Sequence, residues 1–301
     1  MPVDFLSDEQ VARYGRFAAE PSPGELELFF RLDERALTRA RSKRAPANRL
    51  GWAVQWGAVR MLGAFVTEDL SAVPEVVVRF AAEQVEVDPA EFGAYADRRQ
   101  SRYEHAWEIR DAYGYTEFES AEEQLRALWA RRVWASTEGP RALFDRAVVW
   151  LVEHRVLLPG ITTPTRLVAE VRRVENARLY GLLAERTPAG TAAALRGLLE
   201  VPEGRRVSEL ERLRTSPVKA SGRVLVRELD RVSEIAGLGA GRVDIEPVPA
   251  VKLAGLARYG MASKARRCGS WSLGGGRRRC WPRSGIWRPR RSMTRWMCWI
   301  C

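Results

Sequence analysis

The chain has few of the side chains that metal binding and nucleophilic chemistry require. Its 301 residues include only 2 histidines, His105 and His154, and all 4 cysteines lie at or after Cys268. Most of the chain therefore has no Cys–His pair to bind zinc or to act as nucleophile and base. We expect a structural role for His105, a solvated or capping position at a helix end for His154, and neither a cofactor nor a metal.

The sequence also has no long apolar run, and we expect no secretory leader at its start. No uninterrupted apolar run approaches the roughly 20 residues that cross a bilayer as a helix. Asp4, Asp8 and Glu9 occupy the start of the chain, where a secretory signal carries positive charge before an apolar core. We therefore expect a cytoplasmic protein with no membrane partner.

Acidic residues disappear from the last part of the chain. Glu246 is the last of them, and 13 of the 49 Lys and Arg residues follow it. The net charge of +11 and the isoelectric point near 10.1 therefore come from the C-terminal segment. Residues 1–246 carry 36 cations against 38 anions, a net charge of −2. A surface for nucleic acid in this part must be a local patch rather than a general property of the chain.

The composition changes abruptly at Arg266, where the four cysteines and many tryptophans begin. A basic aromatic arm for nucleic acid or membranes is one interpretation. A zinc site at Cys298 and Cys301 is another, although their C-x-x-C has no second pair at zinc-finger spacing. A frameshift near codon 265 explains more. The codons under Trp296–Ile300, shifted by one base, encode an acidic, leucine-rich helical pattern. We predict that residues 266–301 are a disordered, out-of-frame tail.

Before this tail the sequence predicts helices only. Ser7 with Gln10 and Ser22 with Glu25 form capping boxes, and Asp33 is a further N-cap. We find no convincing strand pattern, so the fold class is all-α. The expected helices begin at about residues 7, 22, 34, 49, 74, 88, 101, 119, 140, 164, 188, 207, 221 and 250.

The helix expected at about 49–66 is the centre of the first domain. Leu50, Val54 and Met61 belong to an apolar face with i, i+3, i+4 and i+7 spacing, and the opposite face is also largely apolar. Asn48 stands where an N-cap is expected. Short links to two preceding helices favour a helix-turn-helix-like arrangement. We place the first bundle at 1–160, because Pro159-Gly160 stops the chain, and a second helical domain at 161–265.

A cationic run leads into this central helix and indicates a local DNA-binding patch. Helix-turn-helix proteins place side chains from a helix N-terminus into the major groove and bind phosphates with basic residues. Such charges can also form an ordinary solvated face, and Asn48 can be a cap only. We expect Trp52 and Trp56 to pack rather than to stack on bases. The candidate DNA-binding residues are Arg39, Arg41, Lys43, Arg44, Asn48, Arg49, Arg60, Arg98, Arg99 and Arg102.

Several segments resemble a known family. Residues 48–65, Asn-Arg-Leu-Gly-Trp-Ala-Val-Gln-Trp-Gly-Ala-Val-Arg-Met-Leu-Gly-Ala-Phe, resemble the N-terminal region of Tn-three-family transposases, the enzymes of class II replicative transposons. Residues 1–10, 103–115, 156–163 and 256–264 resemble the same region, in the same order. The match covers about residues 1–265, and we regard the chain as a truncated member of that family.

The resemblance implies that the chain binds the terminal inverted repeats of a transposon, in the bacterial cytoplasm and associated with the nucleoid. In this family an Asp-Asp-Glu set on an RNase-H-like domain cuts and joins DNA with two metal ions. That domain lies far beyond the N-terminal region, so we do not expect an enzyme. Two alternatives remain: a helical module that binds other transposase subunits, and an inactive remnant of a decayed transposase.

Overall fold

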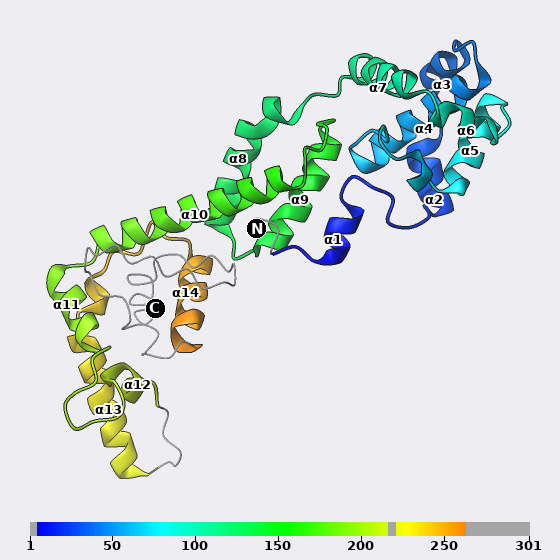
Figure 1. The fold of residues 1–301 in the computed structure, drawn as a ribbon. Coiled ribbons are helices and arrows are strands. Elements are labelled where there is room, and N and C mark those ends of the chain that lie inside the picture. The colour runs from blue at the N-terminus through cyan, green and yellow to red at the C-terminus, as the bar shows by residue number, and fades with distance from the viewer. Residues whose placement is uncertain (1–4, 216–220, 263–301) are drawn as a thin grey trace. The chain divides into compact units, whose positions relative to one another are not determined.

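The computed structural model describes residues 5–215 and 221–262, and this part of the chain consists of helices and the links between them (Figure 1). Within it the only β interaction is an isolated bridge between Thr116 and Val156, so the all-α prediction is confirmed. None of the described helices is long and apolar enough to cross a membrane. The predicted tail at 266–301 and its frameshift lie outside the described residues.

The chain forms two compact units. Unit 1 comprises residues 1–128 and 139–169, and unit 2 comprises residues 129–138 and 170–301. Two long helices, α8 (Phe118–Ala135) and α10 (Thr162–Glu185), contain residues of both units. The other helices of unit 1 are α1 (Asp8–Arg13), α2 (Pro23–Glu25), the π-helix η1 (Leu26–Phe30), α3 (Glu34–Arg41), α4 (Pro46–Leu62), the 3-10 helix η2 (Leu70–Ala72), α5 (Glu75–Val85), α6 (Glu91–Ala96), α7 (Arg99–Tyr113) and α9 (Pro140–Glu153).

Helix α4 is the core of unit 1. Most of its 17 residues are buried, and α3, α5, α6, α7, α9 and η1 all contact it. Two glycines allow its neighbours to come close: a Cβ atom at Gly51 would overlap the ring of Tyr95, and one at Gly57 would overlap the ring of Phe30. Trp52 and Trp56 are buried, at 0% and 3% exposure. The prediction that these tryptophans pack in the core is confirmed.

The local helix signals are largely confirmed. Both capping boxes form, and the Asp33 carboxylate accepts a hydrogen bond of 2.7 Å from the Ala36 amide. Helix α1 ends at Arg13, and Gly15 soon after it has a left-handed φ of 63°. The predicted cap of the central helix is wrong. Helix α4 begins at Pro46 with Ala45 as its N-cap, because proline fits the first helical position, where no amide donor is needed.

Unit 2 contains the remaining helices: α11 (Ala189–Gly197), α12 (Glu209–Arg214), α13 (Gly222–Gly237), the 3-10 helix η3 (Ala240–Arg242) and α14 (Ala250–Ala262). One small core packs Leu195 of α11 against Leu210 and Leu213 of α12. Ile235 and Leu238 pack on this core from the C-terminal end of α13. None of the residues of α13 is buried, so this helix has little core of its own.

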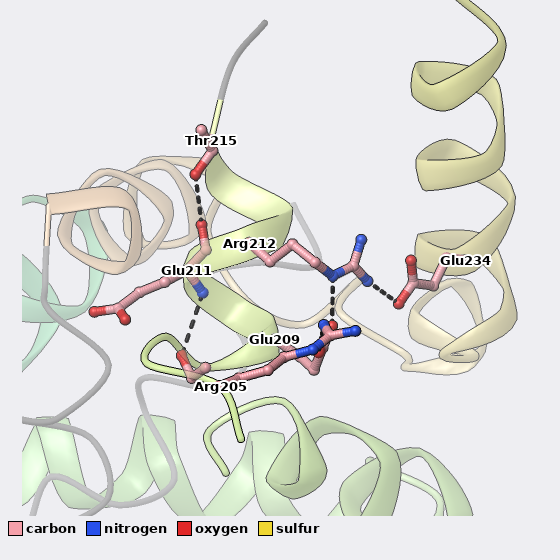
Figure 2. Close-up of polar contacts among 7 residues, drawn as sticks. Arg205, Glu209, Glu211, Arg212, Thr215 and Glu234 are labelled. Atoms are coloured by element: carbon pink, nitrogen blue, oxygen red, sulfur yellow. Dashed lines mark hydrogen bonds and ion pairs between the residues drawn. The ribbon is translucent and has the colours of Figure 1, made fainter. Parts of the chain in front are cut away.

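Ion pairs reinforce the contact between α12 and α13 (Figure 2). Glu209 accepts from Arg205 at 2.6 Å and from Arg212 at 2.5 Å, and the Arg212 guanidinium also pairs with Glu234 of α13. The Thr215 hydroxyl donates to the Glu211 carbonyl at the end of α12. These arginines are therefore occupied by carboxylates of unit 2.

Candidate nucleic-acid interface

The link between α3 and α4, residues 42–45, contains the centre of the predicted cationic patch. It is a tightly bonded turn. The Ser42 hydroxyl donates to the Arg39 carbonyl at 2.7 Å, and the Lys43 amide donates to the Ala40 carbonyl at 3.1 Å. From the other side, Arg49 Nε donates to the Lys43 carbonyl at 2.8 Å. Arg49, near the N-terminus of α4, therefore holds the α3–α4 turn in its conformation.

Arg39 of α3 and Lys43 of the turn share one carboxylate. Arg39 Nη1 lies 3.4 Å from Glu108 Oε1, and Lys43 Nζ bonds Glu108 Oε2. Glu108 belongs to α7, which packs against α4. The pairing therefore links the α3–α4 turn to a helix more than 60 residues later in the chain.

The two other cations of the run differ from each other. Arg41 pairs with Glu86 at 2.5 Å, just after the end of α5. Arg44 is exposed and has no hydrogen-bond or ion-pair partner among the described residues. Arg44 is thus the cation of the turn that is immediately available to an anionic ligand.

Asn48 lies in the first turn of α4 rather than ahead of it. Its side-chain Oδ1 is buried and has no hydrogen-bond partner within the described part of the chain. A buried carbonyl oxygen without a donor is costly, typically by about 1–3 kcal/mol. Among the buried polar side-chain atoms of α4 that lack a partner, Asn48 Oδ1 therefore lies closest in sequence to the α3–α4 turn.

Arg60 has a different environment from the rest of the predicted set. Its guanidinium donates to the carbonyls of Phe29 at 2.7 Å and Leu28 at 2.9 Å, at the end of η1. It also lies over the ring of Trp56, 4.2 Å from the centroid. Burial lowers the pKa of the Arg60 guanidinium below its usual range. These contacts use Arg60 to fasten η1 to α4.

The second predicted cluster lies at the start of α7. Arg98 is the exposed N-cap residue of that helix. Arg99 lies over the ring of Tyr103 at 5.8 Å, while Arg102 Nη1 is 3.4 Å from the Glu68 carbonyl. The structure therefore places this cluster on the helix that also carries Glu108, and both clusters belong to unit 1.

Glu108 and Glu86 are the residues of this surface that sequence analysis missed. Each holds cations of the α3–α4 region, yet each is separated from them by more than 40 residues. No local spacing rule connects such partners, because i,i+3 and i,i+4 rules apply only within one helix. Only the packing of α7 and α5 around α4 reveals the pairs.

Both histidines have the roles expected from sequence. His105 is buried on α7, and its Nδ1 lies 3.2 Å from the Tyr95 hydroxyl. His154 is the exposed C-cap residue of α9, and its ring stacks on Trp150. In residues 5–215 and 221–262, no group of three or more His, Cys, Asp or Glu side chains has the arrangement of a metal site.

A cavity of about 310 Å³ lies in unit 1 beside α7. Phe65, Leu157 and Leu158 give it apolar walls, and Trp107 lines it while remaining 59% exposed. Arg110 at the cavity is paired with Glu117, so the cavity adds no free cation to the patch.

Comparison with known proteins places the chain in a family. Residues 5–171 match the family described as "Domain of unknown function (DUF4158)". The chain is 42% identical over 267 residues to the transposase for transposon gamma-delta of Escherichia coli (strain K12), a match that spans 87% of this chain and 26% of that protein. It is 30% identical over 220 residues to the transposase for transposon Tn501 of Pseudomonas aeruginosa, covering 71% and 22%.

A third relative, less similar in sequence, is also a transposase. The chain is 24% identical over 237 residues to the transposase for transposon Tn1546 of Enterococcus faecium, covering 78% of this chain and 24% of that protein. The chain thus spans about a quarter of the length of the curated relatives that it matches. It belongs to the family that shares this domain, and corresponds to the N-terminal part of the Tn-three-family transposases.

Proposed function

We propose that the chain is a DNA-binding fragment of a Tn-three-type transposase, which recognises the terminal inverted repeats of a transposon and lacks strand-transfer activity of its own. Its partner is double-stranded DNA, and its place is the nucleoid of the bacterial cytoplasm. The observation that carries the proposal is the α3–α4 turn, where Arg44 is exposed at the entrance to the buried helix α4 and has no partner in the described part of the chain.

The chemistry of the turn suits a phosphate backbone. Phosphate contacts come mainly from Arg and Lys side chains and from backbone amides at helix N-termini. The turn supplies the first kind of contact through Arg44, which lies two residues before Pro46, the first residue of α4. It does not supply the second, because Pro46 has no amide hydrogen and the amides of Asn48 and Arg49 donate to the Ala45 carbonyl. Its fixed geometry, held by Arg49, reduces the conformational entropy that is lost on binding.

The absence of catalysis is part of the proposal. Resemblance assigns DNA cleavage and joining to a distinct Asp-Asp-Glu domain. The chain corresponds to about a quarter of its relatives. We therefore expect no metal-dependent nicking or strand transfer from the isolated chain.

The test is an equilibrium titration against a duplex of the transposon end and a scrambled duplex, near physiological salt. Fluorescence anisotropy of the labelled duplex measures both affinities. We expect preferential binding to the repeat, and an affinity that falls steeply as salt rises, because phosphate contacts release counterions. Both the full chain and a version that ends at residue 265 are measured, since 10 cations follow residue 265. Equal affinity for the two duplexes in both versions contradicts the proposal.

Arg44→Ala is the sharpest variant for this surface. We expect it to weaken binding to the repeat by about 1–3 kcal/mol, the usual value of one base or phosphate contact. Its folding stability should be unchanged, because Arg44 has no partner among the described residues. Arg79→Ala is a matched control, since Arg79 is exposed on α5 and, among the described residues, pairs only with Glu75 of its own helix. If Arg44→Ala and the unaltered chain bind the repeat with equal affinity, Arg44 does not contact DNA and the DNA-binding surface lies elsewhere.

One observation favours a second function, as a helical module that binds other transposase subunits. Helix α13 exposes an apolar stripe in which Leu225, Leu229 and Val232 are each at least 60% exposed. Exposed stripes of this kind mark protein-binding surfaces. Binding through such a stripe depends weakly on salt, whereas DNA binding through about 6–10 phosphates weakens steeply. The salt dependence of the titration therefore separates the two functions.

A further inference from the structure

We propose that Glu108 is a specificity-determining residue, which limits binding to non-matching DNA by occupying Arg39 and Lys43 in the free protein. The inference rests on the proposed DNA-binding function. It assigns a role to an acidic residue on a surface where DNA binding requires cations.

The geometry makes Glu108 a shared partner. Its two carboxylate oxygens serve different cations: Oε1 lies 3.4 Å from Arg39 Nη1, and Oε2 bonds Lys43 Nζ. The Arg39 and Lys43 side chains are 38% and 20% exposed, and that of Glu108 is 29% exposed. All three side chains therefore remain accessible to a ligand while they are paired.

The pairing changes what the turn offers to DNA. Adjacent to Lys43, Arg44 is exposed without a partner among the described residues, whereas Glu108 holds Arg39 and Lys43. A phosphate can use Arg39 or Lys43 only by displacing Glu108. On a matching sequence, base contacts compensate for that displacement. On other sequences nothing compensates, so binding there relies on the free cation. Discrimination by an unfavourable step of this kind is a general route to specificity.

Glu86 is the other acidic residue near the turn, and it fits this role less well. Within residues 5–215 and 221–262 it pairs with Arg41 alone, and its side chain is 79% exposed. An exposed pair contributes little, because water and salt screen it. The pairing that controls two cations at once is that of Glu108.

The experiment compares Glu108→Gln with Glu104→Gln in the full chain. Both substitutions remove one negative charge from α7. Glu104 accepts from Gln100 at 2.8 Å and pairs with no cation in the described part of the chain. Residues 263–301 are the same in every variant, so differences between variants report position 104 or 108. Affinities for the repeat and the scrambled duplex are measured between 50 and 200 mM salt, and elution from heparin provides a readout independent of sequence.

We expect Glu108→Gln to bind the scrambled duplex more tightly than either Glu104→Gln or the unaltered chain. Two released cations make the slope of log affinity against log salt steeper by about 1.8, at roughly 0.9 per phosphate. The affinity gain should therefore shrink about twelvefold between 50 and 200 mM salt. Affinity for the repeat rises less, so the ratio of the affinity for the repeat to the affinity for the scrambled duplex falls several-fold. Elution from heparin also moves to higher salt.

A second variant tests the proposal if Glu108→Gln fails to fold. In the otherwise unaltered chain, Lys43→Gln should not change the slope of log affinity against log salt for the scrambled duplex. The reason is that Glu108 still holds Lys43 when the unaltered chain binds that duplex. A decrease of about 0.9 in that slope contradicts the proposal. The proposal is also contradicted if Glu108→Gln has the same affinities and salt slope as Glu104→Gln, or if Glu108→Gln binds both duplexes more weakly than the unaltered chain. If the unaltered chain shows no preference for the repeat but Glu108→Gln still gains on heparin, the masking by Glu108 holds and the proposed recognition of the repeat fails.

Discussion

Replacing Arg60 by lysine separates a structural cation from a DNA-binding one. The substitution keeps the positive charge but removes the planar guanidinium. Arg60 donates through two nitrogens to the carbonyls of Leu28 and Phe29, at 2.9 and 2.7 Å, and stacks on Trp56. Lysine can replace one of these hydrogen bonds, but not both together with the stacking.

The magnitude follows from the lost contacts. A hydrogen bond from a charged donor contributes roughly 1.5–3 kcal/mol, and a partly exposed cation–π contact about 0.5–1 kcal/mol. Because Arg60 is only partly buried, we use the lower end and expect Arg60→Lys to reduce the free energy of unfolding by about 2 kcal/mol. Affinity for the transposon end should change little.

Urea denaturation followed by tryptophan fluorescence measures the stability, and the duplex titration measures binding. Arg44→Lys is the control, because it keeps charge at an exposed position without a partner in the described structure. If Arg60→Lys is as stable as the unaltered chain but binds the repeat more weakly, the structural role of Arg60 is refuted and its guanidinium belongs to the DNA surface.

Two further predictions concern the core of unit 1. Gly57→Ala should destabilise the protein in urea denaturation by about 1–2 kcal/mol, because the new methyl group overlaps the ring of Phe30 and overpacking outweighs the gain in helix propensity. Stability should also fall as the pH is lowered from 7 to 5, by about 2 kcal/mol, because burial first and Lys43 second lower the pKa of His105 to about 4. The unfolded chain takes up this proton near pH 6.5 and the folded chain does not, so the loss occurs between about pH 6.5 and 4 and is absent above that range.

Controls for these two predictions are available in the same chain. Gly93 lies in α6 with open space around it, so Gly93→Ala should be neutral or stabilising. His105→Gln should abolish most of the pH dependence between 7 and 5, whereas His154→Gln should preserve it, because His154 is exposed at the end of α9. Equal stability of the Gly57→Ala and Gly93→Ala variants contradicts the packing argument, and an unchanged pH profile in His105→Gln contradicts the assignment of the proton.

Sequence predicted the helices well because their signals are local. The Ser7 and Ser22 capping boxes and the Asp33 cap involve residues three positions apart, and all of them form. The cap at Asn48 failed because Pro46 already supplies a favourable first helical position. A capping preference is a tendency, and the proline outweighs it here.

The electrostatics of the candidate site was less predictable. The cationic run from Arg39 to Arg44 is evident in the sequence, but its pairing with Glu108 depends on where α7 packs. Likewise, Arg60 belongs to the same set of predicted DNA-binding residues, yet its guanidinium donates to carbonyls of η1. Long-range contacts therefore decide which cations are free, and sequence alone cannot distinguish them.

The division of the chain into two units has a practical consequence for protein production and proteolysis. Residues 129–138 belong to unit 2 although unit 1 resumes at residue 139 and continues to 169. The polypeptide therefore passes between the units at three points rather than one. A fragment that stops at residue 160 lacks part of unit 1, and a ribosome must synthesise residue 169 before unit 1 has all of its sequence. A single proteolytic cut near residue 128 or 138 leaves segments of one unit on both products, so limited proteolysis should yield nicked protein that stays associated until it is denatured.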